Sequence, residues 1–394
     1  MEVEDKLRVL AAAAQFDICG YSGRRDFIPS PHRFIYRAAL PGGGSVCLFK
    51  VLLTNVCTND CAYCCNRVTR DFPRRAFKPE ELAGTFMQLY QRRMVRGLFL
   101  SSGIADNPTR TMAEMVKTVE ILRYRYGFKG YIHLKILPGA SFDCVAEGCK
   151  LADRVSVNME APTVQHLARL SKRKNLHQNI VQPMRWVKKL MASDEKLVPS
   201  GQTTQFVIGA AGESDQDILR TTSALYHEVE LRRAYFSPFR PVPDSPLEGQ
   251  PPANPLRAHR LYQSDWLLRI YGFPLKEVEL ALGEKGNLSL RQDPKLVIAE
   301  RQPWLFPVDV NRASYEELLR VPGVGPISAQ RIIEARREHS INAMLQLRKM
   351  RVVTSRAAPY IWFQGMLDFE NQASFIPHLD EPDEPAPSLA AALG

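Results

Sequence analysis

Asn55-Val56-Cys57-Thr58-Asn59-Asp60-Cys61-Ala62-Tyr63-Cys64 is the stretch of sequence that decides the fold. Its cysteines have the spacing CxxxCxxC, and such short intervals let one loop place three thiolates around a single inorganic centre. Thiolates select zinc or iron–sulfur centres over hard cations. A structural zinc site normally needs four protein ligands, and no histidine or second cysteine pair follows at the usual spacing. Cys65 could be a fourth ligand only with adjacent-residue geometry that is awkward for a tetrahedron.

Short apolar runs alternate with longer helical stretches from just before this loop onward, which is the pattern of βα units around a parallel sheet. Six units predict an α/β fold, a partial (β/α)6 barrel. Working residues of such folds lie past the carboxyl ends of the strands, so the cysteine loop is expected at the active end of the first strand. The expected strands are Cys47–Thr54, Gly97–Ser101, Gly130–Leu137, Arg154–Asn158, Thr203–Gly209 and Arg233–Phe239, and the expected helices are Pro79–Val95, Thr111–Tyr126, Phe142–Lys150, Ala161–Leu170, Leu176–Ala192, Glu213–Val229 and Leu256–Tyr271.

The chain is long enough for one large domain and one small one, since it has 394 residues of which 45% are hydrophobic. A proline-rich crossing follows the last expected strand, and the pattern becomes wholly helical beyond Trp304. The acidic, proline-rich and alanine-rich end is expected to be disordered. We therefore expect an N-terminal extension packing on the barrel (1–45), the barrel core (46–272), a linker (273–303), a small all-α domain (304–377) and a disordered tail (378–394).

Composition constrains the partner and the compartment. The formal charge of +10 favours a polyanionic partner. No apolar run approaches the roughly 18 residues that span a bilayer, and Ala11–Ala14 is too short for a signal peptide, so we expect a cytoplasmic protein without a membrane partner. In that reducing compartment the eight cysteines are not expected to form a disulfide framework. The ones without metal spacing should be buried as small apolar groups, namely Cys19, Cys47, Cys144 and Cys149.

A second motif lies in the small domain. Ser314 and Glu317 form a capping box at a helix start, and the helix ends in Val321-Pro322-Gly323-Val324-Gly325-Pro326. The two glycines permit positive φ in a tight reversal, and the free amides at the next helix start favour a phosphate. The candidate phosphate contacts are Gly323, Gly325, Ser328, Gln330 and Arg331, with Arg336, Arg337, Arg348, Lys349 and Arg351 extending the positive field.

A weak repeat follows this hairpin. At an offset of 29 residues, Val321, Ala329 and Ile332 lie opposite three residues of similar type. The partners are Met350, Ala358 and Ile361. This predicts a duplicated hairpin whose glycine-poor second copy gives structural support.

The cysteine loop resembles the radical S-adenosylmethionine (SAM) superfamily, whose signature is this spacing with an aromatic residue before the third cysteine, here Tyr63. The resemblance implies that Cys57, Cys61 and Cys64 hold a [4Fe–4S] cluster with one iron free to chelate SAM. It also implies that one electron from the cluster cleaves SAM to a 5′-deoxyadenosyl radical. A zinc site or a purely structural cluster is the alternative reading of the same cysteines.

The resemblance extends over about residues 47–247 and implies further cofactor contacts. Where the family has Gly-Gly-Glu after a strand, this chain has Ser101-Ser102-Gly103, so the usual acid is missing. An ordinary strand-end turn, a helix cap and a local glycine turn are the alternative readings of these positions. The implied contacts are Tyr63, Ser102, Gly103, Asn158, Glu160, Gly209 and Gly212, and Lys135 and Arg185 are further charged candidates.

The Pro-Gly-Val-Gly turn resembles the helix-hairpin-helix motif of DNA repair and competence proteins, which grips the DNA backbone without reading bases. The alternative is a hairpin used for packing or for contact with protein. A basic stretch near the cysteine loop could steer a strand toward the cluster, although a charge run is more often a solvated loop. Its members are Arg67, Arg70, Arg74 and Arg75.

Together the two motifs resemble a family described as DNA modification or repair radical SAM proteins. That resemblance implies a radical enzyme that modifies or repairs DNA, and a one-electron donor such as flavodoxin or ferredoxin. An RNA-modifying radical enzyme and a non-catalytic iron–sulfur DNA-binding module are the alternatives. A target base in duplex DNA must be extruded or already unpaired. The sequence leaves the oligomeric state, the modified atom and the product open.

Overall fold

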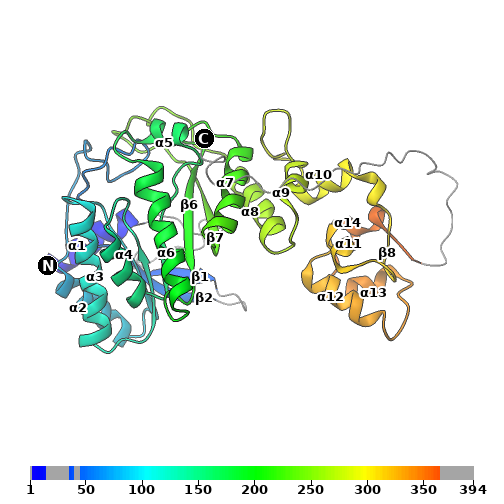
Figure 1. The fold of residues 1–394 in the computed structure, drawn as a ribbon, viewed down its shortest axis with the longest axis horizontal. Helices are drawn as coiled ribbons and strands as arrows, with labels where there is room; N and C mark the ends of the chain where they lie inside the picture. The colour runs from blue at the N-terminus through cyan, green and yellow to red at the C-terminus, as the bar shows by residue number, and fades with distance from the viewer. Residues whose placement is uncertain (1, 15–34, 40–44, 364–394) are drawn as a thin grey trace. The chain divides into compact units, whose positions relative to one another are not determined.

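The computed structural model describes residues 2–14, 35–39 and 45–363. These residues divide into two compact units, each described by itself below. The first contains residues up to 213 together with 220–258, and the second contains 214–219 with 259–363 (Figure 1). Within the described ranges, no helix has both the length and the apolar character that crossing a membrane requires. Cys19 and the expected disordered tail lie outside these ranges.

The first unit is built on a curled, mixed sheet of seven strands that forms a half-barrel, with the strands in sequence order. The edge strand β1 pairs antiparallel with β2, with Ile35 opposite Phe49, and all later neighbours pair in parallel. Parallel pairing brings the carboxyl ends of six strands to one edge. The strands are β1 Ile35–Ala39, β2 Ser45–Leu52, β3 Gly97–Ser101, β4 Tyr131–Lys135, β5 Arg154–Ser156, β6 Gln202–Ile208 and β7 Arg233–Pro238.

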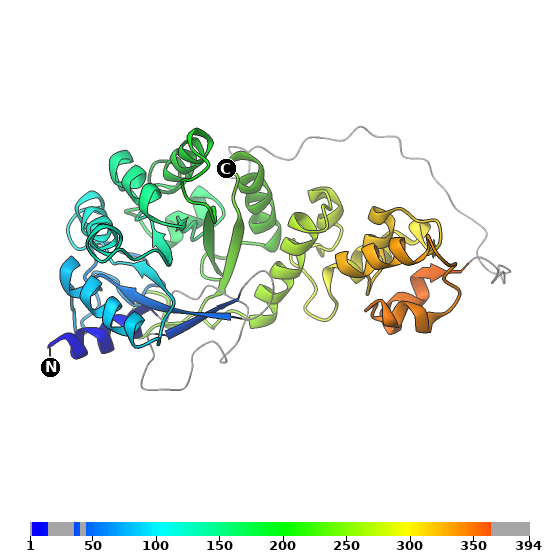
Figure 2. The same cartoon turned by 90° about the horizontal axis from the view of Figure 1, so that it is seen from below.

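Helices connect the parallel strands and cover the outer face of the sheet, as Figure 2 shows for the cyan and green segments. Their starts follow local capping chemistry: the side chain of Asn107 accepts a 2.8 Å hydrogen bond from the Arg110 amide at the start of α3. The helices are α1 Glu2–Ala14, α2 Pro79–Gln91, α3 Pro108–Glu120, α4 Phe142–Leu151, α5 Val164–Leu170, α6 Gln182–Ser193, α7 Asp215–Glu228 and α8 Pro255–Arg269, with π-helical segments at Ile121–Arg125 and Leu176–Val181.

The apolar core of the half-barrel lies between the sheet and these helices. Phe49 points outward from β2 and stacks on Phe86 of α2 with ring centroids 6.4 Å apart. Phe86 also meets Phe128 edge-on at 4.9 Å. Because successive strand residues face opposite sides, neighbours of these outward residues face the barrel interior.

The predicted fold class is confirmed, and each of the six expected strands is present. The structure adds β1 within the expected N-terminal extension, since its pairing with β2 depends on a partner ten residues further along rather than on a local pattern. Two of the expected helices continue through π-helical segments, which a 3.6-residue period does not distinguish.

The second unit is mainly helical and includes one short parallel pair of strands, β8 and β9, in what was expected to be an all-α domain. The expected linker 273–303 contains α9 and α10, because Asp293 caps α10 through the Leu296 amide at 3.1 Å and Pro294 occupies its first turn. The elements are α9 Leu275–Glu279, α10 Pro294–Arg301, β8 Val308–Asp309, α11 Tyr315–Arg320, α12 Pro326–Ala335, α13 Met344–Lys349, α14 Thr354–Ala357 and β9 Ile361–Trp362, with 3-10 turns at Pro303–Leu305 and Ala358–Tyr360.

The predicted capping box and the duplicated hairpin are both confirmed. The Glu317 amide donates to Ser314 Oγ at 3.1 Å, and the Ser314 amide donates to Glu317 Oε2 at 2.6 Å. Helices α13 and α14 form the second hairpin, in which Arg351 has a left-handed backbone with φ +66°, as Gly323 has in the first with φ +87°. Each turn thus contains a left-handed residue, but Arg351 lies one position earlier in the repeat than Gly323 does.

Candidate functional site

A cavity of about 190 Å³ lies at the carboxyl ends of the barrel strands. The three cysteines of the loop line it from one side, together with Tyr63. Ser102 and Gly103 after β3 line it too, as do Asn158 and Glu160 after β5. The structure thus brings eight of the predicted residues to one cavity. The other polar lining residues are Asn59, Asn66, Ser101, Lys135, Lys174, Gln205, Ser237 and Arg240.

The chemistry of this lining fits an iron–sulfur cluster and a polar cofactor. Ser102 Oγ and Asn158 Oδ1 are buried without a hydrogen-bond partner, and buried polar atoms need one. Burial raises the pKa of the Cys61 thiol to about 12, a shift that the nearby Lys174 opposes. Among the described residues, no three His, Cys, Asp or Glu side chains converge closely enough to hold a single metal ion.

Backbone hydrogen bonds fix the cysteine loop, residues 55–66, against two neighbouring segments. The Thr58 amide donates to the Ile104 carbonyl and the Ala62 amide to the Leu170 carbonyl, both at 2.8 Å. Asp60 adds a side-chain anchor, because its carboxylate accepts a 2.5 Å hydrogen bond from Ser171 Oγ. The Ser171 bond and the Lys172 amide hold the pKa of Asp60 below its usual value, although burial opposes them.

Arg74 clamps the inside of the same loop. Its guanidinium stacks on Phe72 at 3.8 Å from the ring centroid. It also donates hydrogen bonds of 2.5 to 3.0 Å to the backbone carbonyls of Asn55, Asn66, Arg67 and Arg70.

The other members of the basic stretch are engaged as well. Arg67 donates to the Asp60 carbonyl, Arg70 to the Cys65 carbonyl at 2.6 Å, and Arg75 pairs with Asp5 at 2.7 Å. Arg67 and Arg70 thus hold carbonyls of the loop, whereas Arg75 pairs outside it; the sequence analysis expected a steering surface instead.

Gly103 lets the β3 turn approach the cysteine loop. A Cβ at this position would lie 2.4 Å from the Val56 carbonyl oxygen and 3.2 Å from Cys57 Cβ. The Gly103 amide donates to the Thr54 carbonyl at 2.7 Å. A glycine is therefore required here to seat the loop, in addition to its place in the cavity wall.

Glu160 connects the strand end to the cysteine loop. It has a left-handed backbone with φ +66° and forms an ion pair with Lys174 at 3.1 Å, where each side chain is only 7% exposed. Burial alone would lower the pKa of Lys174, but the charges of Cys61 and Glu160 raise it above its usual value. Burial and the charge of Glu160 likewise raise the pKa of Tyr63. Lys174 was missed by the sequence analysis because it follows α5 in a polar run without a motif.

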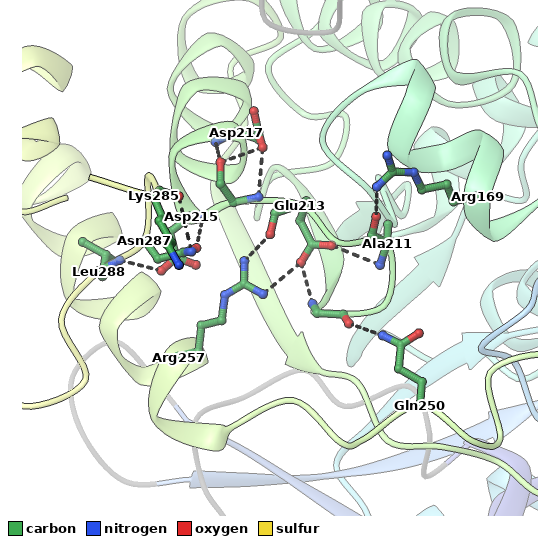
Figure 3. A network of polar contacts seen from close by, with 12 residues as sticks. Arg169, Ala211, Glu213, Asp215, Asp217, Gln250, Arg257, Lys285, Asn287 and Leu288 are labelled. Atoms are coloured by element: carbon green, nitrogen blue, oxygen red, sulfur yellow. Dashed lines mark hydrogen bonds and ion pairs between the residues drawn. The ribbon is translucent and has the colours of Figure 1, made fainter. Parts of the chain in front are cut away.

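Gly209 and Gly212 do not line the cavity. They form a turn after β6 with φ +86° and +73°, which is closed by Glu213 (Figure 3). The Glu213 carboxylate accepts hydrogen bonds from the amides of Gly209 and Ala211 and pairs with Arg257 at 3.3 Å. Figure 3 shows that Gln250 and Arg169 add side-chain bonds to carbonyls of the same turn.

The remaining charged candidates of the first unit differ in position. Lys135 lies at the end of β4 and lines the cavity. Arg185 lies on α6, is half exposed and approaches Glu228 at 3.8 Å. Of the two, the structure places only Lys135 near the cysteine loop.

In the second unit, the hairpin turn, residues 321–326, packs against the turn of the second hairpin. A Cβ on Gly323 would lie 2.5 Å from the Val353 carbonyl oxygen. The Gly323 carbonyl in turn accepts a 3.0 Å hydrogen bond from the Val353 amide. Gly325 approaches Tyr271, whose hydroxyl would lie 3.3 Å from a Cβ. Gly323 is therefore needed for close backbone approach. Gly325 meets only a side-chain hydroxyl and has φ −110°, so the positive φ expected at both glycines is found at Gly323 alone.

A buried lysine supports the same turn from α10. Lys295 is 7% exposed, and its Nζ donates to the Val324 carbonyl at 2.6 Å and lies 4.8 Å from the Tyr271 ring centroid. Burial lowers the pKa of Lys295 to about 7, with Asp293 opposing and Arg356 adding to the shift. The sequence analysis missed Lys295 because it lay in the expected linker.

The predicted phosphate contacts differ in exposure. Gln330 is exposed and bonds Glu334 at 2.9 Å, while Arg331 is half-buried. Ser328 is only 5% exposed, because it lies on the face of α12 that packs into the unit, so its side chain is not presented to a ligand. Arg336 binds the carbonyls of Val310 and Ala313. The exposed cations are Arg337, Arg348, Lys349 and Arg351.

Comparison with known protein families gives two matches. Residues 51–225 match the radical SAM superfamily, and residues 307–358 match the helix-hairpin-helix motif. The chain therefore contains a radical SAM domain. The radical SAM match runs from the end of β2 through β6 and includes the cysteine loop, and proteins of this superfamily use a [4Fe–4S] cluster and SAM.

Several solved structures are similar to this chain over about half of its length. They include methylornithine synthase, PylB (TM-score 0.45, 16% identity, covering 56% of this chain and 60% of that one). The hydrogenase maturase HydG from Carboxydothermus hydrogenoformans has a TM-score of 0.42 at 13% identity, covering 56% of this chain and 50% of that one. The match thus spans about half of that maturase. No curated protein matches this chain by sequence.

Proposed function

We propose that the chain is a radical SAM enzyme that modifies or repairs DNA. The observation that carries the proposal is the cavity in which three thiols of one loop meet two buried polar atoms that lack partners, Ser102 Oγ and Asn158 Oδ1. When bound, the cluster supplies the electron that cleaves SAM to a 5′-deoxyadenosyl radical. In this proposal Cys57, Cys61 and Cys64 hold the cluster.

The chain's own residues bind and orient the cofactor. Ser102 and Asn158 offer hydrogen bonds to its polar groups, and the Glu160–Lys174 pair keeps charged groups fixed at the cavity wall. Gly209 and Gly212 shape the turn beyond β6 and do not touch the cavity, so in this proposal they act through the backbone of the strand end. The largely buried wall excludes water from the reacting centre.

The helix-hairpin-helix motif supports nucleic acid as the substrate class. Glycine turns at a helix start hold backbone phosphates, and the exposed Arg348, Lys349 and Arg351 on the second hairpin extend the positive charge. We propose DNA as the polymer, and a small one-electron donor such as flavodoxin or ferredoxin as a partner in the cytoplasm.

The experiment is formation of 5′-deoxyadenosine by anaerobically reconstituted protein with dithionite and SAM. Cys57→Ala should abolish both product and cluster absorbance, since one iron loses its ligand. Cys144→Ala is the matched control, because Cys144 is free and lies outside the cavity. If wild type forms no more product than Cys57→Ala does, the protein is not a radical SAM enzyme. The alternative of a non-catalytic iron–sulfur module would then be supported.

A binding experiment separates the polymers. DNA and RNA of the same sequence compete for the protein across a salt series, and affinity should fall with salt in proportion to the phosphates contacted. Preference for RNA in this competition would replace DNA by RNA in the proposal.

A further inference from the structure

Each of the two hairpins places an exposed aliphatic side chain at the start of its second helix. Ile327 is 63% exposed in the first turn of α12, and Val353 is 51% exposed as the N-cap residue of α14. An aliphatic side chain stabilises a fold by leaving water, and these two residues remain at least half exposed. They therefore contribute little to the core of the second unit.

The two side chains belong to turns that pack on each other. The Val353 amide donates to the Gly323 carbonyl at 3.0 Å, and a Cβ on Gly323 would lie 2.5 Å from the Val353 carbonyl oxygen. Ile327 follows Gly323 by four residues, in the helix that begins just after this contact. The first hairpin turn thus packs directly on one residue of the pair and leads within four residues to the other.

The segments around these turns are strongly basic. The acidic residues of the first hairpin lie at the start of α11, away from the turn, or in the second half of α12 and beyond it. Arg356 forms an ion pair with Asp293 of the neighbouring α10 start. Residues 321–333 and 344–361 contain no acidic residue and five cations, namely Arg331, Arg348, Lys349, Arg351 and Arg356. Exposed aliphatic carbon within positive charge suits a partner that offers both phosphates and apolar faces, as DNA does.

The faces of DNA bases are available only where stacking is interrupted. In a paired duplex each base covers its neighbours, so an aliphatic side chain at a groove meets mainly sugar and phosphate. Where a base is unpaired, contact with an aliphatic group removes the apolar surface of both from water. Proteins that bind the minor groove insert side chains such as Ile and Leu between bases in this way. An exposed aliphatic pair can therefore distinguish unpaired from paired DNA without reading its sequence.

We propose that Ile327 and Val353 contact base faces, so that the second unit binds DNA preferentially where bases are unpaired. The inference rests on the proposed function, because it assigns the kind of DNA that the hairpins bind. The cations supply affinity for the backbone, and the aliphatic pair supplies the preference. Such binding brings the chain to a base that is already out of the stack, which chemistry on a base requires.

Fluorescence anisotropy of the full reconstituted chain tests the proposal with two DNA probes of one sequence. One probe is a paired duplex, and the other is the same duplex with an internal unpaired loop. We expect wild type to bind the looped duplex roughly tenfold more tightly, the order of magnitude gained by burying an aliphatic side chain.

Serine variants remove the aliphatic groups one at a time. Ile327→Ser and Val353→Ser should each lower the preference several fold, and the double variant should bind both probes alike. Serine is a favoured N-cap residue, so Val353→Ser leaves α14 at least as well capped. Leu345→Ser is the matched control, since Leu345 is 64% exposed and lies at the end of α13 farther from the turn. It should keep the wild-type preference.

Salt dependence and base fluorescence give two independent readouts. The serine variants remove no phosphate contact, so their affinity for the paired duplex should fall with salt at the wild-type slope. A 2-aminopurine in the unpaired loop should change its fluorescence when wild type or Leu345→Ser binds. The change should be much smaller when the double serine variant binds.

Three results would overturn the proposal. The first is equal affinity of wild type for the two probes, or a preference that the double serine variant retains. The second is a lowered Tm of the serine variants, which would show that the pair supports the fold. The third is a wild-type dimer in sedimentation that Ile327→Ser dissociates, which would assign the pair to contact between protein chains.

The two proposals fail separately. Wild type that forms 5′-deoxyadenosine yet binds both probes alike refutes this inference alone. Wild type that prefers the looped duplex yet forms no 5′-deoxyadenosine refutes the proposed enzyme alone.

Discussion

The cysteine loop and the hairpin turn are both tight backbone segments, but different interactions stabilise their conformations. Charged side chains hold the cysteine loop: Arg74 and Arg67 reach into it and donate to its carbonyls. Close backbone packing stabilises the hairpin turn, because Gly323 has no side chain and leaves room for the Val353 carbonyl. The buried Lys295 also donates a hydrogen bond to the Val324 carbonyl. Arginine side chains occupy the inside of the cysteine loop, whereas the hairpin turn packs against the turn of the second hairpin.

This difference predicts which substitutions each segment tolerates. A loop organised by hydrogen bonds loses them one group at a time, so a single change weakens it by degrees. A turn organised by backbone contact cannot accept one added carbon without moving its partner. Three substitutions test the contrast, beginning with the largest expected effect.

Gly323→Ala should be the most damaging. Its Cβ would meet the Val353 carbonyl oxygen at 2.5 Å, and the left-handed backbone costs an L-residue roughly 1–2 kcal/mol by itself. We expect loss of DNA binding and a lower Tm of the second unit, measured by fluorescence anisotropy and calorimetry. Gly283→Ala is the matched control, since its nearest contact at 3.6 Å is ordinary packing. Unchanged DNA affinity in Gly323→Ala would show that the turn is not held by backbone contact.

Arg74→Met should have an intermediate effect on the cysteine loop. It removes the donor of four carbonyl hydrogen bonds, and hydrogen bonds to charged groups are worth about 1.5–3 kcal/mol each before the loop relaxes. We expect a lower iron content after reconstitution, with DNA binding retained. Arg75→Met controls for loss of charge, because Arg75 pairs with Asp5 near the surface. Full cluster occupancy in Arg74→Met would contradict the role of the clamp.

Lys295→Met should have the smallest effect, and one that depends on pH. The folded pKa of about 7 lies below the usual 10.5, so the unfolded chain binds more protons between these values. The contribution of Lys295 to stability therefore rises with pH from about 7 to 10.5, by at most about 1.4 kcal/mol per pH unit. Hydrogen exchange of the α12 amides, compared with Lys295→Met at each pH, measures it. A difference that stays constant over this range would contradict the buried, neutral amine.

Local sequence patterns were enough to predict much of the fold. The range Gly97–Ser101 was predicted for β3 and is the range observed, because three large apolar residues between a glycine and two serines determine it. The capping box at Ser314 was equally local. β1 and the two helices of the expected linker were missed, although β1 pairs with residues only 6 to 14 positions further along and α10 begins at the local cap formed by Asp293.

Site residues that belong to a sequence motif could be predicted, and those that only the fold brings to the site could not. The cysteines, Ser102 and Asn158 lie together as predicted. Lys174 came to the site only through its ion pair with Glu160, which lies 14 residues earlier in the chain. Ser328 shows the converse, because the phase of α12 against its neighbours buried a residue whose type suggested a contact.

The arginine clamp has a consequence for the repair of oxidative damage. Hydrogen bonds from arginine side chains to backbone carbonyls hold the cysteine loop from within the protein. Exposure to oxygen that strips the cluster should therefore leave the three thiols in place, without unfolding the barrel. A stripped molecule could then be refilled by iron and sulfide under reducing conditions, so that damage at the metal does not commit the chain to degradation.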